Sequence, residues 1–363
     1  MKLFAKHALK AATATTTTTS AGTSNDGDGT NIIPQVQQSG LGFGCMGISA
    51  FYGDKVMSND DAQQLLKFVY DSNCRHFDTA EAYSTKGETH NEEVLGAFFA
   101  TVPRDSYSIA TKYWPNPDND KAYTYEDVKT HLLASLKRLN LEYVDLYYAH
   151  RVLSIDGGVT FVQTCQRLKE EGLIKEIGLS EVSGKWLTEI IEKAGSGSTA
   201  AVDAVQQEWS LLSRTMVEDD LIPVCKQHGI AIVAYSPLAR NLLATKVVES
   251  PKDWRGSLPR YSTENLKRNN LIVDKINELA KKYGNATSAQ LSLAWLFHKA
   301  SELGVTVVPI PGTTKIDNAK VNIGSVNIQL SNDDCQVLER LSKDVVGERG
   351  NERYMSLSIE NQN

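Results

Sequence analysis

The sequence has few of the features that mark secreted, membrane-spanning or nucleic-acid-binding proteins. Only five of its 363 residues are cysteine, and they are odd in number, scattered and without a CxxC pair. This argues against a disulfide-stapled secreted scaffold and indicates free thiols in a reducing compartment. No run approaches the ~18 consecutive apolar residues of a membrane span. Lys and Arg number 38 against 44 Asp and Glu, so the net charge of −6 indicates no nucleic-acid partner.

Metal-ligand clusters and internal repeats are also missing. No group of Cys, His, Asp or Glu has the spacing of a metal site, so we predict no bound metal. No period of about 20–50 residues recurs, which argues against a solenoid. With 41% hydrophobic and 23% charged residues, the composition is that of a globular protein that buries a sizeable core.

The first 38 residues differ from the rest of the chain. They combine lysines among apolar residues, a threonine run at 15–19 and a Ser/Gly/Asn/Asp stretch at 20–29. Such a segment cannot bury enough apolar surface to offset its ordering entropy, so we expect a disordered tail at 1–38 on a cytoplasmic protein. The lack of acidic residues among the first 25 is also typical of a transit peptide, which leaves import into a mitochondrion or plastid as the alternative.

Past residue 40, short apolar runs alternate with amphipathic segments. Strands are predicted at 41–46, 76–79, 107–111, 144–148, 174–179, 201–206, 231–235 and 305–310. Helices are predicted at 62–71, 124–139, 161–170, 182–194, 217–228, 266–283, 286–300, 315–323 and 332–341. This alternation favours parallel pairing through helical crossovers. We predict an α/β fold, a single-domain (β/α)8 TIM barrel at 39–345 with a C-terminal tail at 346–363. A doubly wound open sheet is the alternative.

A glycine-rich hexapeptide at 42–47 matches G-x-G-x-x-G, the fingerprint of dinucleotide-binding Rossmann domains. That fingerprint requires a helix that opens directly on the glycines. Here the glycines fall within and after the first predicted strand, and the next capped helix begins only near Asn59. We therefore interpret them as positions where a ligand approaches the backbone at the mouth of the barrel.

Four polar residues stand at the carboxyl ends of consecutive predicted strands, the face of a barrel that carries chemistry. Asp78 and Tyr83 follow the second strand, Lys112 the third and His150 the fourth. The Lys112 ammonium is expected to lower the pKa of the Tyr83 phenol, which makes proton donation easier. A buried Lys112 needs a carboxylate partner, which Asp78 can supply. Taken singly, the Asp–Lys pair fits a structural salt bridge and His150 a structural hydrogen bond.

Taken in order, the motifs of this chain resemble the aldo-keto reductase family from residue 41 to 341. They are LGFGCMG at 41–47, FDTAEAY at 77–83, ATK at 110–112, VDLYYAH at 144–150, IGLSE at 177–181, AVQ at 204–206, AYSPL at 234–238 and IPGTTK at 310–315. The resemblance implies a (β/α)8 barrel that binds NADPH or NADP+ without a Rossmann domain. It also implies reduction of aldehydes or ketones to alcohols by hydride transfer.

The resemblance assigns roles to individual residues. Tyr83 is expected to be the general acid, tuned by Asp78 and Lys112, while His150 orients the carbonyl. The implied cofactor-binding residues are Gly44, Cys45, Met46, Asp78, Ser180, Glu181, Gln206, Tyr235, Ser236, Leu238, Arg240, Gly312, Thr313, Lys315, Asn318 and Asn322.

Within this set, the ring of Tyr235 is expected to stack on the nicotinamide, and Ser180 and Gln206 to hold its carboxamide. Gly312, Thr313 and Lys315 are expected to grip the 2′-phosphate, which favours NADPH over NADH.

The sequence departs from the family pattern at four of these positions or their neighbours. Glu181 stands where many relatives carry Asn, and Asn318 where some carry Arg. Ala239 and Asn241 replace glycines that are frequent in the loop approaching the pyrophosphate, so this loop is expected to close differently.

The substrate is expected to be a small-molecule carbonyl compound, with no nucleic-acid or membrane partner. Trp114 and Tyr52 are predicted to line its pocket, with a place in the core as the alternative for Trp114; Phe51, Trp209 and Arg151 are further candidates. We expect a monomer or a weak homo-oligomer.

Two other functions compete with carbonyl reduction. One is a cofactor-binding regulatory or channel-associated subunit with little turnover. The other is a barrel hydrolase that uses Asp78 and Glu81 as paired carboxylates.

Overall fold

Eight parallel strands form the centre of the structure. The computed structural model describes residues 40–50, 57–84, 89–116, 118–119, 122–195 and 201–362. The strands are β1 (Phe43–Gly44), β2 (His76–Asp78), β3 (Ser108–Tyr113), β4 (Val144–Ala149), β5 (Ile174–Ser180), β6 (Ala204–Glu208), β7 (Ala231–Tyr235) and β8 (Val307–Pro309). They pair in chain order, each parallel to the next. Each of the eight predicted runs overlaps one of these strands, and the α/β class is confirmed.

The two ends of the curved sheet meet. The amide of Gly42, just before β1, donates to the carbonyl of Pro309 in β8 at 2.9 Å. The backbones pack so closely that a Cβ on Gly44 would lie 2.7 Å from the carbonyl oxygen of Ile310. Glycine at 44 thus lets two segments of backbone touch, a role that the pattern alone does not reveal. Because the order β1 to β8 never reverses, the doubly wound alternative is wrong.

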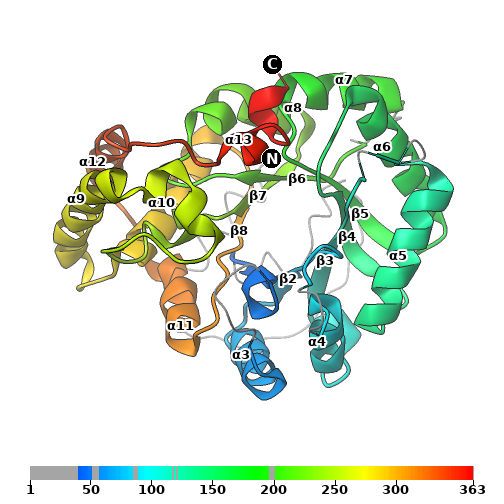
Figure 1. Ribbon diagram of the computed structural model, residues 1–363, viewed down its shortest axis with the longest axis horizontal. Helices are drawn as coiled ribbons and strands as arrows, with labels where there is room; N and C mark the ends of the chain where they lie inside the picture. Colours follow the sequence, from blue (N-terminus) through cyan, green and yellow to red (C-terminus); the bar gives the residue numbers. More distant parts are fainter. Residues whose placement is uncertain are drawn as a thin grey trace, which may run out of the picture. The chain divides into compact units, whose positions relative to one another are not determined.

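Helices cover the outside of this sheet (Figure 1). They are α3 (Asn59–Asp71), α4 (Asn91–Phe99), α5 (Tyr125–Leu139), α6 (Ile155–Glu170), α7 (Gly184–Ala194), α8 (Ile222–His228), α9 (Thr263–Ala280), α10 (Ser288–Leu303), α11 (Ile316–Gly324), α12 (Asn332–Ser342) and α13 (Glu352–Met355). At least one helix joins each strand to the next, as parallel pairing requires. The (β/α)8 barrel is confirmed.

Local signals explain where most helices begin. The hydroxyl of Ser58 caps α3, which starts at Asn59, where the capped helix is expected, three residues before the amphipathic stretch predicted at 62–71. Ser154 likewise caps α6, which starts at Ile155 instead of the predicted 161. A glycine pair at 157–158 hides this first turn from sequence reasoning, because glycine lowers helix propensity.

Two segments differ from the predicted secondary structure. The single helix predicted at 217–228 is a π-helix, Met216–Leu221, followed by α8. Helix α4 was not predicted at all. Its capping box uses the ring of His90 where Ser or Thr is usual, with Glu93 bonding back to the His90 backbone. A search for the usual hydroxyl residues therefore misses it.

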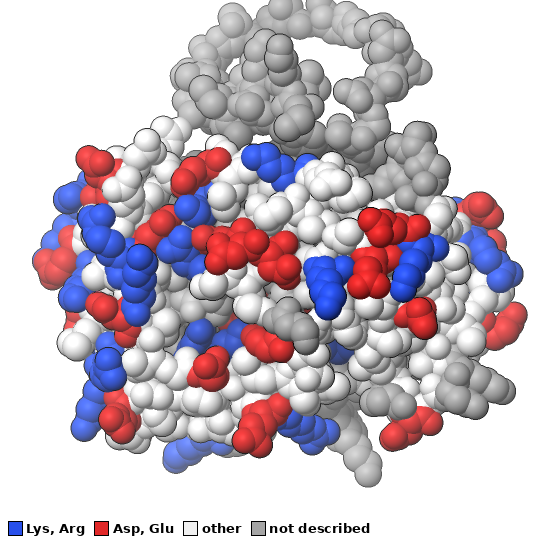
Figure 2. Space-filling view, turned by 90° about the horizontal axis from the view of Figure 1, so that it is seen from above, with Lys and Arg blue, Asp and Glu red and all other residues white. Residues whose placement is uncertain are grey.

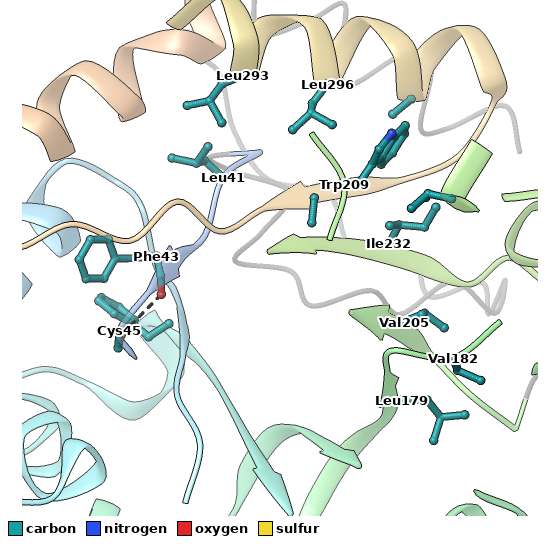
Figure 3. Close-up of a cluster of buried hydrophobic side chains, with 14 of the residues drawn as sticks. Leu41, Phe43, Cys45, Leu179, Val182, Val205, Trp209, Ile232, Leu293 and Leu296 are labelled. Carbon is teal, nitrogen blue, oxygen red and sulfur yellow. Dashed lines mark hydrogen bonds between the residues drawn. The ribbon is translucent and has the colours of Figure 1, made fainter. Parts of the chain in front are cut away.

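Strand residues alternate between the two faces of the sheet. Phe43, Leu179 and Ile232 belong to the large core between strands and helices, which Figure 3 shows together with Leu293 and Leu296 of α10. A separate cluster forms from intervening strand positions, which a closed barrel turns inward; its members are Ala110, Leu146, Tyr148, Ala204, Ala231, Val233, Val308 and Ile310. Apolar side chains thus occupy both faces of the sheet.

The C-terminal segment 346–362 packs onto the rest of the described chain. The amide of Val346 donates to the side chain of Asn269 at 3.0 Å. Near the other end, the side-chain amide of Gln362 donates to the backbone carbonyl of Glu181, just after β5, at 2.8 Å. Figure 1 shows this segment in red. The tail predicted at 1–38 lies outside the described residues.

The surface carries charges of both signs. Lys and Arg are interspersed with Asp and Glu on the face shown in Figure 2. Within the described ranges, no helix is long and apolar enough to cross a bilayer. Among the described residues, no group of three or more His, Cys, Asp or Glu side chains could hold a metal ion.

Candidate active site

Asp78, Tyr83, Lys112 and His150 come together at the carboxyl ends of β2, β3 and β4. The ammonium of Lys112 contacts the carboxylate of Asp78 and lies 3.4 Å from the hydroxyl of Tyr83. It also donates to the backbone carbonyl of Thr79 at 2.7 Å. The rings of Tyr83 and His150 are 5.7 Å apart and nearly perpendicular. The predicted convergence of these residues is confirmed, as is the pairing of buried Lys112 with Asp78.

Neighbouring elements hold this cluster in place. Gln206 of β6 donates to the second carboxylate oxygen of Asp78 at 2.7 Å. The hydroxyl of Thr79 donates to the side-chain oxygen of Asn91, whose amide donates to the Cys45 carbonyl at 3.0 Å. Asn91 is the first residue of α4, so the helix absent from the prediction ties the end of β2 to the segment after β1.

The charge state of the cluster follows from burial. Burial lowers the pKa of Lys112, but Asp78 and Tyr83 outweigh it and raise that pKa above its usual value. Burial raises the pKa of Tyr83 more than Lys112 lowers it, so the expected net lowering is wrong. Tyr83 therefore keeps its proton firmly and sits beside a permanent cation.

His150 is uncharged at neutral pH. Burial lowers its pKa well below the usual value, and the cations Arg151 and Lys112 act in the same direction. Its Nδ1 is buried and has no hydrogen-bond partner among the described residues. A neutral imidazole with an unused nitrogen is suited to bond a polar atom of a ligand.

The carboxylates of Asp78 and Glu81 serve different partners. Asp78 is bound by Lys112 and Gln206. Glu81 instead bonds the ring of His131 at 2.7 Å and accepts from the backbone amide of Trp114. A glycosidase-type pair must face one shared bond, so this arrangement speaks against the hydrolase.

The residues after β1 form a structural link. A 3-10 helix, Met46–Ile48, follows β1 directly, and no α-helix opens on the glycines, as expected. The thiol of Cys45 is fully buried, donates to the Phe43 carbonyl and has a pKa well above its ordinary value because of burial. Met46 packs against the cluster of Ala50, Ala80 and Tyr83. Gly44 also touches the stretch after β8, where a Cβ on Gly312 would lie 2.4 Å from its carbonyl oxygen.

The aromatic residues considered for the substrate pocket differ in their exposure to solvent. Trp114 is 37% exposed and meets the His150 ring edge-on at 5.0 Å, which places it outside the core and beside the cluster. Trp209 is instead fully buried against Trp295 in the core (Figure 3), so it does not line a pocket. Tyr52 and Phe51 lie outside the described residues.

The three residues expected to face the nicotinamide are neighbours. Ser180 ends β5 and pairs in register with Gln206 of β6, and Tyr235 ends β7 opposite Glu208 of β6. Ser180 and Gln206 are almost fully buried, while Tyr235 is partly exposed. The barrel thus brings these side chains to one stretch of its rim.

Glu181 lies in a buried ion network with the C-terminal segment. Its carboxylate accepts from Arg349 at 2.7 Å and from the hydroxyl of Tyr235. The same guanidinium lies 3.2 Å from Glu208 and 2.6 Å from Glu360. Burial raises the pKa of Glu181, but the charge of Arg349 outweighs it and brings the value to about 2. The carboxylate is therefore committed to Arg349, although the resemblance implied that Glu181 binds the cofactor.

Arg240 joins the same network. Its buried guanidinium donates to Glu208 at 2.9 Å and to the backbone carbonyl of Arg349. The resemblance implied a place near the pyrophosphate, but this side chain serves the C-terminal segment. No local signal reveals Arg349, because 168 positions separate it from Glu181.

The loop after β7 has backbone conformations that favour glycine. Ser236, Ala239, Arg240 and Asn241 all have positive φ, between 46° and 91°. The loop therefore adopts left-handed conformations without the glycines that the family often uses there, at a cost in strain. The carbonyl of Ser236 accepts from the amide of Ala239 at 2.8 Å, which closes the turn over Leu238.

Replacing Ala239 with Gly is expected to stabilise the protein. Ala239 has φ of +48°, and relief of left-handed strain exceeds the added entropy of glycine in the unfolded chain, for a net gain of about 0.5–1 kcal/mol. Denaturant unfolding of both proteins measures the difference. Ala294→Gly in the middle of α10 is the control and should destabilise by about 1 kcal/mol. An equal loss in both variants would contradict the assignment of strain.

The residues expected near the 2′-phosphate lie at the start of α11. Lys315 is the N-cap residue, and no side chain caps this helix. Its amide donates to the hydroxyl of Thr313 at 3.1 Å. Lys315 and Asn318 are exposed, whereas Asn322 is buried. An uncapped helix start beside an exposed ammonium is suited to a phosphate.

Known proteins share both the sequence pattern and the barrel. The sequence profile of the Aldo/keto reductase family matches residues 40–343. "Probable aldo-keto reductase 1" of Glycine max is 40% identical over 308 residues, which cover 82% of this chain and 84% of that protein.

Solved structures of aldo-keto reductases also match the fold of this chain. A thermostable aldo-keto reductase in complex with the inhibitor epalrestat matches with a TM-score of 0.66 at 28% identity, covering 85% of this chain and 95% of the other. An aldo-keto reductase from Klebsiella pneumoniae in complex with NADPH matches with a TM-score of 0.64 at 25% identity, covering 85% and 92%. The profile match spans most of the chain, from before β1 to the end of α12, and the chain belongs to the aldo-keto reductase family.

Proposed function

We propose that this protein is an NADPH-dependent oxidoreductase that reduces aldehydes or ketones to alcohols. The observation that carries the proposal is the buried contact of Lys112 with Asp78 and Tyr83, beside an uncharged His150. A structural salt bridge alone would not need the phenol and the imidazole at the same strand ends. Family membership and the NADPH bound to the Klebsiella pneumoniae relative support the same reaction and cofactor.

The residues of this chain fit a nicotinamide dinucleotide. Ser180, Gln206 and Tyr235 would hold the nicotinamide end, because they end neighbouring strands next to the cluster. Lys315, at the uncapped start of α11, would bind the 2′-phosphate. NADPH supplies a hydride when bound. The other residues we propose around it are Gly44, Cys45, Met46, Asp78, Ser236, Leu238, Gly312, Thr313, Asn318 and Asn322, with only the backbone of Glu181 and Arg240.

The side chains of the cluster have separate tasks in carbonyl reduction. Negative charge develops on the carbonyl oxygen, and Tyr83 would give that oxygen its phenolic proton. The Lys112 ammonium, 3.4 Å from the hydroxyl, would stabilise the phenolate left behind. His150 would orient the carbonyl by a hydrogen bond, since its imidazole is uncharged. Trp114, and Tyr52 from outside the described residues, would line the pocket.

Replacing Lys315 with Ala is expected to weaken NADPH binding about tenfold and to leave NADH binding within about twofold, because only NADPH carries the 2′-phosphate. Fluorescence titration of both cofactors gives the dissociation constants. Lys320→Ala is the control, because Lys320 is also an exposed lysine on α11. Equal weakening of NADPH and NADH by Lys315→Ala would remove Lys315 from recognition of the 2′-phosphate.

For the compartment, we propose the cytoplasm. All five cysteines are free and buried, which suits a reducing environment. Fusing residues 1–38 to a fluorescent protein tests the transit-peptide alternative, since import of the fusion into an organelle would overturn the proposal.

A further inference from the structure

Arg151 is a half-buried cation beside the proposed catalytic cluster, and none of the described residues forms an ion pair with it. It follows His150 directly at the end of β4, and its Nη1 donates to the His150 backbone carbonyl at 2.7 Å. Its Nε is enclosed by protein and has no hydrogen-bond partner among the described residues. Two buried arginines nearby differ: Arg240 after β7 and Arg349 of the C-terminal segment lie within 3.2 Å of carboxylates.

The groups in contact with the Arg151 guanidinium are aromatic rings, and no carboxylate of the described residues lies within ion-pair distance of it. Its guanidinium carbon lies 5.9 Å from the centre of the Trp114 ring and 5.8 Å from that of Tyr354. The carboxylate that influences it, Glu181, has its oxygens bound by Arg349 and Tyr235. Burying a charge without a partner is costly, so such a group points to a ligand that brings the opposite charge.

We propose that Arg151 binds a carboxylate of the substrate, so that the enzyme prefers aldehydes and ketones that carry a carboxylate. The inference rests on the proposed carbonyl reduction. A guanidinium matches the planar geometry of a carboxylate, and the aromatic walls of Trp114 and Tyr354 shield the ion pair from water. The guanidinium lies beside His150 and Trp114, and its neighbour Tyr354 bonds the hydroxyl of Tyr235 at the end of β7, where the nicotinamide is proposed.

The test compares two matched substrates, 4-carboxybenzaldehyde and its methyl ester, by NADPH oxidation. The quantity measured is the ratio of their kcat/KM values, which cancels effects on folding and cofactor binding. We expect the wild-type protein to favour the carboxylate by about tenfold or more, and Arg151→Met to abolish this preference through a higher KM. Arg151→Lys, which keeps the charge, should restore part of it.

Arg75→Met is the matched control. Arg75 is also half-buried, also has a buried Nε without a hydrogen-bond partner and also covers a tyrosine ring, that of Tyr70 at 4.5 Å. It precedes β2 at the opposite end of the strands, so its loss should leave the substrate ratio unchanged. A wild-type ratio near one, or a preference that survives Arg151→Met, would overturn the inference.

Failure of the proposed function gives a different result. In that case neither aldehyde is reduced, and binding of terephthalate is measured instead by the thermal shift of the NADP+-saturated protein. Stabilisation of the wild type but not of Arg151→Met would keep Arg151 as a carboxylate site without turnover. No shift in either protein would overturn the carboxylate site as well.

Discussion

Tyr83→Phe should lower the turnover of carbonyl reduction by about a hundredfold or more while leaving NADPH affinity nearly unchanged. General acid catalysis by a positioned side chain contributes on the order of 10²–10⁴ in rate. Tyr83 holds the hydroxyl that Lys112 approaches to 3.4 Å, and phenylalanine keeps the ring beside His150 without the proton. Steady-state NADPH oxidation gives kcat, and a fluorescence titration gives the dissociation constant of NADPH.

Tyr107→Phe is the matched control for this substitution. Tyr107 is a buried tyrosine just before β3, and its hydroxyl has no hydrogen-bond partner among the described residues. Removing that hydroxyl should leave turnover unchanged. Wild-type turnover in Tyr83→Phe would exclude Tyr83 as the acid. Tight NADPH binding by the wild type without turnover on a panel of aromatic and aliphatic aldehydes would favour the regulatory subunit.

Arg349→Met should destabilise the protein by about 3–5 kcal/mol at pH 7, because it leaves buried carboxylates without their cation. Glu181 is fully buried, and its carboxylate has Arg349 as its close cationic partner at 2.7 Å. Glu208 keeps Arg240 at 2.9 Å, so the loss should fall mainly on Glu181. Urea unfolding of both proteins measures the difference.

The stability contributed by the Glu181–Arg349 ion pair depends on pH. The folded pKa of Glu181, about 2, lies below its ordinary value of 4.5, so the ion pair stabilises the fold above pH 4.5. That stability is lost as the pH falls from 4.5 toward 2. The gap between the wild type and Arg349→Met should therefore be largest at pH 7 and shrink in acid.

Two further variants isolate the ion pair. Arg340→Met on α12 removes an exposed arginine and should change the stability by less than about 0.5 kcal/mol. Adding Glu181→Gln to Arg349→Met should recover part of the loss, because the stranded charge is removed. A loss below about 1 kcal/mol in Arg349→Met would show that the network contributes little to stability.

Features that depend on neighbouring residues could be predicted from the sequence. Each strand is a short apolar run, and its carboxyl end is recognisable because polar residues such as Lys112 and His150 follow it. Once the barrel is inferred, parallel strand ends must share one face, so the contact between Asp78 and Lys112 follows without coordinates. Helix α4 could not be predicted because its cap is the ring of His90.

The sequence by itself therefore determined the barrel, the family and the residues of the proposed catalytic cluster, since periodicity and motifs are written in consecutive positions. Tertiary structure alone decided that the pKa of Tyr83 is raised and not lowered, because the effect of burial outweighs the charge of Lys112. Tertiary structure also assigned the side chains of Glu181 and Arg240 to the C-terminal segment, and it left Arg151 without a carboxylate partner among the described residues. Such outcomes depend on which charges meet across 100 or more positions of chain, as Arg349 and Glu181 do at a separation of 168.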